Sequence, residues 1–297
     1  MHRRRGNGVT AGSGLDAELV LVSGRAGPPG SPMNMYWVYD LPNWLFGTLT
    51  VVVFVVIGLA GLYVTRNWAR RLHIVDHSHN DIVGFYLAGV TVLYGITLAL
   101  LAVGTWTTYS EVQSKIDREA TSLGSLYRDI SAYPEPLRSS LRDDLRKYTH
   151  QVIDVDWPMQ RRGIVPNDET ALLRAVQDHL MSFEPATERQ KILAVEAYAA
   201  FNELTQGQQA RLNSVTEEMP GPLWILVIVG ALICIAVTWC FHTKSFAMHF
   251  WMTILFSALL GLMIYLIAAL DNPYRGKISV TPEPLERVYQ QVMSSGN

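Results

Sequence analysis

The chain has 297 residues, of which 49% are apolar and 17% are charged, and its net charge is −2. Without a basic excess or a glycine-rich phosphate loop, the sequence predicts no nucleic-acid partner and no nucleotide chemistry. No serine, cysteine or histidine stands in a nucleophile motif, so we predict no enzyme and no cofactor.

The first 34 residues are rich in Gly, Arg, Ser and Pro, which predicts a disordered or misassigned amino end. Met33 and Met35 are alternative start positions, because the aromatic residues of a membrane boundary follow them.

Four apolar runs are each long enough to cross a bilayer, at residues 44–64, 82–106, 222–241 and 248–270. A hydrocarbon core of about 30 Å needs roughly 20 helical residues at about 1.5 Å each. The sequence therefore predicts transmembrane helices 1 and 2 within 35–106, and helices 3 and 4 within 221–270.

The second run carries two different helical faces at 100° per residue. One face has small residues that favour close helix packing, including Gly84, Ala88, Gly95 and Ala99. The other face is weakly polar and supplies candidate pore-lining residues, namely Tyr94, Thr97, Leu101 and Thr105. The alternative is that these hydroxyls bond to carbonyls of their own helix or to a neighbouring helix.

Residues 107–220 are predicted to form a helical extramembrane domain. The apolar spacing extends the second span to Tyr133, where Pro134 and Pro136 end it. A helix over 136–155 follows, closed by Trp157-Pro158, and then a short helix capped by Asn167 and ending at His179.

Thr187 and Gln190 have the spacing of a capping box for a last helix that runs to about Glu218. Residues 271–297 are expected to form a tail with a short helix. The predicted fold class is thus an all-α membrane protein, with four transmembrane helices and a helical extramembrane domain inserted between spans 2 and 3.

The short connections at 66–81 and 242–247 carry a higher density of arginine and lysine than the opposite flanks. Positive residues favour the cytoplasmic side, so the helical domain is predicted to lie in the periplasm, with the cytoplasm as the alternative.

Polar residues lie at the ends of two of the predicted spans, and each has a functional and a structural interpretation. His77 and Asp81 have the i, i+4 spacing of a helical metal pair, but a solvated loop explains them as well, and we predict no metal site. Asp271 ends the fourth span, where an acid is either an ion contact or a hydrated helix end.

Two sequence blocks resemble the bestrophin-like family of bacterial membrane proteins. The first runs from Leu93 to Tyr109 and continues through 120–128, and the second is Leu270-Asp-Asn-Pro-Tyr-Arg-Gly276 followed by 280–285. The resemblance covers nearly everything from Met35 to Leu285 and marks Tyr109, Asp271, Asn272 and Pro273 as family-motif residues.

A more distant similarity is to the bestrophins, pentameric anion channels whose second span lines the pore. Asn272-Pro273-Tyr274 is similar to their Asn-Pro-Phe-Gly segment, whereas Gly104 stands where they carry an arginine. Bestrophins keep their large domain in the cytoplasm, which is opposite to the orientation that the arginine count predicts.

The resemblance implies a bestrophin-like ion channel or pore in the bacterial inner membrane. Several copies would form a homo-oligomer in the lipid bilayer, with the second helices around an axial pathway for small ions. The alternative function is a non-conducting, membrane-anchored interaction or sensor module.

Overall fold

The computed structural model describes residues 41–72, 77–166, 169–241 and 245–294, and for residues 67–79 it describes no side chains. All regular elements in these ranges are helical. The expectations for residues 1–34, for the Asn167 cap and for the His77 side chain lie outside the described parts.

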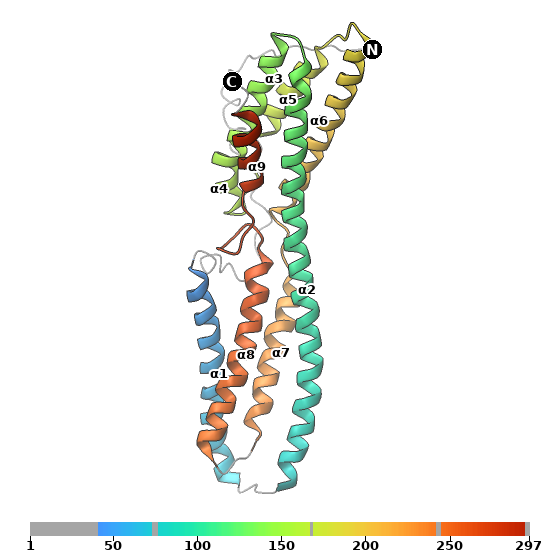
Figure 1. Cartoon of the computed structure of the whole chain (residues 1–297). Coiled ribbons are helices and arrows are strands. Elements are labelled where there is room, and N and C mark those ends of the chain that lie inside the picture. Colours follow the sequence, from blue (N-terminus) through green and yellow to red (C-terminus); the bar gives the residue numbers. More distant parts are fainter. Residues whose placement is uncertain (1–40, 73–76, 167–168, 242–244, 295–297) are drawn as a thin grey trace, which may run out of the picture.

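In the part of the chain that the structure describes, four helices are long and apolar enough to cross a membrane. They are α1 (Asn43–Leu72), α2 (His77–Asp129), α7 (Gly221–Trp239) and α8 (Phe246–Asp271). Figure 1 shows α1, α7 and α8 beside the first half of α2, and we call this group the apolar bundle. Large apolar side chains such as Phe85, Leu93 and Leu255 are exposed on it, as expected for side chains that face lipid.

The helices α1 and α8 pack most extensively within the apolar bundle. Gly261 of α8 makes this approach possible, since a Cβ atom there would lie 2.9 Å from the Cα atom of Val51. Small residues at such crossings allow helix backbones to come close in lipid.

Helix α2 is continuous from the apolar bundle into the second half of the molecule (Figure 1). Its 53 residues correspond to about 80 Å of α-helix. A 3₁₀ turn over Ile130–Ala132 ends it just before Pro134, which confirms the predicted extension of the second span.

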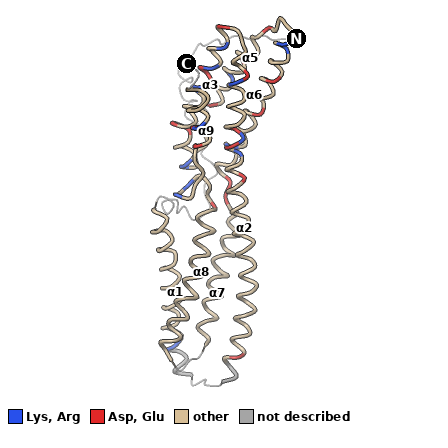
Figure 2. The backbone as a smooth tube through the Cα atoms, in the orientation of Figure 1, with Lys and Arg blue, Asp and Glu red and all other residues tan. Residues whose placement is uncertain are grey.

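Five shorter helices gather around the second half of α2, and we call this group the charged bundle (Figure 1). They are α3 (Leu137–His150), α4 (Trp157–Gln160), α5 (Glu169–Met181), α6 (Glu188–Ser214) and α9 (Glu283–Val288). Leu123, Leu126, Leu145 and Leu204 are fully buried in its apolar core. Acidic and basic residues concentrate in this bundle and are nearly absent from the apolar one (Figure 2).

The structure corrects two predicted helix ends. Trp157-Pro158 does not close the helix that follows α2, because a π-helical turn over Gln151–Asp156 leads directly into α4. Pro158 lies in the first turn of α4, where a proline costs no helical hydrogen bond. At the other end of the domain, α6 stops at Ser214 rather than near Glu218.

The predicted capping box is confirmed. Thr187 accepts a hydrogen bond from the backbone of Gln190, and the Gln190 side chain accepts one from the backbone of Thr187.

Candidate functional site on the second membrane helix

The weakly polar face of α2 is turned toward α7 of the same chain. Tyr94 is 7% exposed, and its hydroxyl donates a hydrogen bond of 2.6 Å to the carbonyl oxygen of Val227. Its ring lies against Gly230, where a Cβ atom would come within 2.4 Å of it. Tyr94 and the buried Thr105, both candidate lining residues, are therefore covered within the protomer.

The threonine hydroxyls of this helix bond to their own backbone. Thr97 donates to the carbonyl of Leu93 at 3.0 Å, and Thr105 donates to the carbonyls of Leu101 and Ala102 at 3.2 and 3.1 Å. The alternative interpretation of these hydroxyls thus describes their bonding in a single chain. Thr97 and Leu101 are half-buried, at the edge of the covered face.

The small face of α2 points away from the other helices of the chain. No atom lies within 4 Å of a Cβ built at Gly84 or at Gly95, and Ala88 and Ala99 are exposed. The sequence interpretation assigned this face to helix packing, but no described helix of the same chain packs on it.

Asp271 at the end of α8 holds the start of α7. Its carboxylate accepts a hydrogen bond of 2.7 Å from the backbone of Met219 and one of 3.0 Å from the indole of Trp224. Asp271 is 6% exposed, so it is a buried anchor and not a hydrated helix end.

The two sequence blocks that carry the family resemblance meet between the bundles. Tyr109 of α2 packs against a buried cluster that contains Ile116, Trp157 and Tyr274. Asn272 and Pro273 shape the loop after α8, where their carbonyls accept hydrogen bonds from the backbones of Arg275 and Val280.

A buried ionic network attaches α2 to the charged bundle. Glu119 of α2 accepts hydrogen bonds of 2.6 and 3.1 Å from Arg211 of α6 and one of 2.6 Å from the hydroxyl of Tyr148. Arg211 also donates to Glu169 of α5. The three charged side chains are fully buried, so this network joins three helices without contact to solvent.

Burial and charge shift the pKa values of the network. Burial, the strongest influence, raises the pKa of Glu169 to about 7, against the opposing effect of Arg211. Burial alone would lower the pKa of Arg211, but the neighbouring carboxylates of Glu119 and Glu169 raise it well above its usual value. One guanidinium faces two carboxylates here, and a proton on Glu169 removes the excess charge.

The network continues to the loop after α8. The hydroxyl of Tyr274 lies 2.9 Å from the Ser214 hydroxyl and donates to the carbonyl of Arg211 at 3.2 Å. Burial raises the pKa of Tyr274 to about 12, so it stays a neutral donor.

Sequence reasoning did not select Glu119, Glu169 or Arg211. Glu119 did carry a signal, because it occupies the apolar stripe formed by Ile116 and Leu123 three and four residues away. A charge on a core-facing stripe predicts a buried partner. Among the described residues, no group of three His, Cys, Asp or Glu side chains could hold a metal ion.

Comparisons with known proteins agree with this fold. The crystal structure of a bacterial bestrophin homolog from Klebsiella pneumoniae matches with a TM-score of 0.61 at 12% identity, covering 83% of this chain and 98% of that one. A mutant of that homolog matches with a TM-score of 0.62 at 13% identity, covering 84% and 99%. At these identities the likeness shows the fold alone.

No curated protein matches the sequence. The model of the Bestrophin-like domain matches residues 52–285, which include most of α1, all of α2, α7 and α8, and the charged bundle up to the start of α9. The chain belongs to the bestrophin-like family.

Proposed function

We propose that this protein is a subunit of an ion channel in the bacterial inner membrane, in which the α2 helices of several identical chains surround an axial pathway. Membership of the bestrophin-like family supports a channel function. Four membrane-length helices and a separate charged bundle are compatible with it.

The single observation that carries the proposed arrangement is the outward face of α2. Gly95, Ala99 and Val103 follow each other at i, i+4 spacing, are exposed, and lie away from the buried Tyr94, which α7 covers, and from the buried Thr105. In a ring of chains, this exposed row of residues could line the central axis, whereas the covered face could not. Small side chains also leave room for water and ions between closely spaced helices.

The proposed lining therefore differs from the set expected from sequence. Thr97 and Leu101 border the outward face and contribute at its edge, while Tyr94 positions α2 on α7 and Thr105 is buried.

Cysteine modification during planar-bilayer recording tests this arrangement. In a Cys240→Ser background, Ala99→Cys should lose more than half of its current when a charged methanethiosulfonate reagent is added. Leu98→Cys is the matched control. Leu98 is next to Ala99 in the chain but is only 5% exposed, so a cysteine there should not react.

If the wild-type protein passes no current under any ionic gradient, the channel proposal is wrong and the non-conducting, membrane-anchored module is favoured. If the reagent blocks the current of the Thr97→Cys variant but leaves that of Ala99→Cys unchanged, the pathway instead follows the other face of α2.

We also propose, from the arginine distribution, that the charged bundle lies in the periplasm. In the Cys240→Ser background, Glu203→Cys, at an exposed position on α6, should react with a membrane-impermeant thiol reagent in cells whose outer membrane has been permeabilised. Reaction only after the inner membrane is broken would place this bundle in the cytoplasm.

A further inference from the structure

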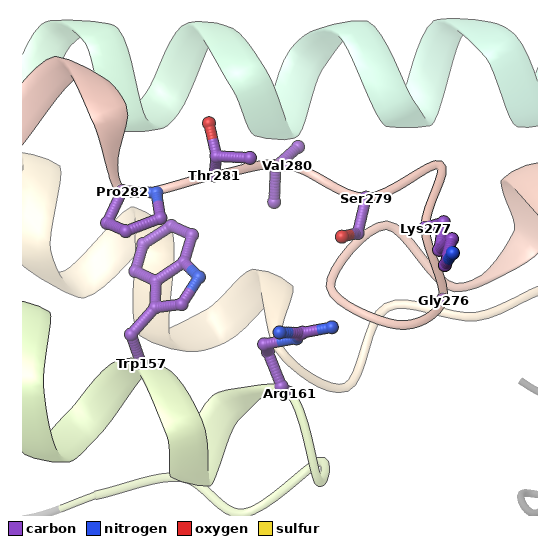
Figure 3. A pocket seen from close by; sticks show the side chains of 8 residues that line it. All are labelled: Trp157, Arg161, Gly276, Lys277, Ser279, Val280, Thr281 and Pro282. Carbon is purple, nitrogen blue, oxygen red and sulfur yellow. The ribbon is translucent and has the colours of Figure 1, made fainter. Parts of the chain in front are cut away.

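A groove of about 470 Å³ lies between α4 and the loop that follows α8. Trp157 and Arg161 form one wall, and the segment from Gly276 to Pro282 forms the other (Figure 3). The guanidinium of Arg161 and the side chains of Lys277 and Ser279 gather at one end of it (Figure 3).

The groove has an excess of positive charge. Within the described residues, neither Arg161 nor Lys277 lies within 4.0 Å of a carboxylate oxygen. Other cations of this region do have such partners, since Lys115 pairs with Glu217 at 3.0 Å and Arg287 with Glu283 at 3.9 Å. Two unpaired cations in one concavity favour an anionic ligand.

The walls are fixed by specific backbone contacts. Arg275 donates a hydrogen bond of 2.9 Å to the carbonyl of Arg162, which ties the loop to the turn after α4. Gly163 lies beneath this contact and adopts a φ of 75°, a conformation that favours glycine. Gly276 adopts a φ of 78°, a conformation that glycine accepts without strain, and Val280 is buried.

The groove lies level with the ends of the apolar helices. A second, smaller hollow places Arg275, Gly276 and Lys277 against Asn43 at the start of α1 and Ala269 near the end of α8. The same loop therefore lines the groove and touches the boundary of two membrane-length helices. A ligand in this groove would lie at the height of lipid headgroups.

We propose that this groove binds a phosphate group, held by the charges of Arg161 and Lys277. The hydroxyl of Ser279 and the indole N–H of Trp157 supply neutral donors around it. Its height favours the phosphate of an anionic lipid headgroup, and free phosphate is the second source of the same chemistry. This site is independent of the proposed channel pathway.

Two probes applied to the purified full-length protein test the site. The first is inorganic phosphate, titrated calorimetrically in a neutral detergent. The second is phosphatidylglycerol, offered in phosphatidylcholine nanodiscs and quantified as the lipid that remains bound after the protein is returned to detergent and washed.

The test variant is Arg161→Gln with Lys277→Gln, and the matched control is Arg189→Gln with Lys191→Gln. The control removes the same charge from exposed positions on α6. Loss of two charged donors should weaken binding of the effective probe by about tenfold or more, whereas the control should bind as the wild type does.

Each outcome decides the proposal. Retention of phosphatidylglycerol without phosphate affinity supports a lipid headgroup, and phosphate affinity without lipid retention supports a soluble ligand. The proposal fails if the wild type binds neither probe, or if the test variant binds both as the wild type does. Both residues are exposed, so circular dichroism of the test variant should match the wild type. Lys277→Glu provides a second variant, which changes the charge of the groove by the same amount and should also weaken binding.

Discussion

The Arg211 guanidinium and the Glu119 carboxylate form a fully buried pair joined by hydrogen bonds of 2.6 and 3.1 Å. The pair connects α6 to α2, and Gly207, one turn before Arg211, lets the two backbones approach. A Cβ at Gly207 would lie 3.0 Å from the Cα atom of Glu119. The position of α2 in the charged bundle thus depends on both packing and charge.

Replacing Arg211 with methionine should strongly destabilise the charged bundle. The change leaves the buried carboxylate of Glu119 without its counterion and Glu169 without its donor, which costs about 3–5 kcal/mol. We expect the melting temperature of the purified protein to fall by about 6–20 °C. Arg189→Met, exposed at the start of α6, is the control and should change it little.

The stability of the protein should depend on pH through Glu169. Its pKa of about 7 in the fold lies above its ordinary value of 4.5, so the folded state holds a proton that the unfolded chain releases between these values. Stability should therefore be highest at low pH with respect to this group, and decrease as pH rises from 4.5 to 7. The loss amounts to roughly 3 kcal/mol at most.

Glu169→Gln should remove this part of the pH dependence in thermal melts recorded from pH 4.5 to 8. Glu203→Gln, on the exposed side of α6, should retain the wild-type profile. An unchanged profile in Glu169→Gln would show that this carboxyl does not titrate in the fold.

Gly261→Leu should separate α1 from α8. The added side chain would meet the backbone of Val51, which cannot move aside as a side chain can, so the overpacking should cost about 1–3 kcal/mol or more. Gly89→Leu is the matched control, because no atom lies within 4 Å of a Cβ there. Melting curves in detergent should show a clear decrease for the first variant only; equal curves would contradict the close crossing.

Asp271→Ala should loosen the connection between the two bundles. It leaves the partly buried Met219 amide and Trp224 indole without their acceptor, at a cost of about 1 kcal/mol for each donor. Asp271→Asn keeps one acceptor oxygen and should lie between the alanine variant and the wild type. The rate of proteolysis in the segment before α7 should be highest for Asp271→Ala, intermediate for Asp271→Asn and lowest for the wild type.

The membrane helices and much of the charged bundle could be predicted from the sequence. Apolar length alone identifies a span, and the Thr187–Gln190 cap is a local hydrogen-bond pattern that needs no tertiary information. Pro158 was misinterpreted because a proline that ends one helix and a proline in the first turn of the next have the same local sequence.

The candidate site was harder to predict for a physical reason. Helical periodicity separates the faces of α2 that contain Tyr94 and Ala99, but which face meets α7 depends on a glycine at position 230, far along the chain. Likewise, Glu119 signals a buried charge, yet its partner Arg211 is 92 residues away and only the folded bundle brings the two together.

The unbroken course of α2 makes it a mechanical lever. The buried salt bridge holds one arm, and the other arm carries Gly95 and Ala99. Glu119 lies about 63 Å from the start of α2, so a tilt of about 4° around it displaces that end by about 4 Å. Protonation or ligand binding near the salt bridge would therefore tilt the part of α2 that carries Gly95 and Ala99, and the helix between them would stay folded.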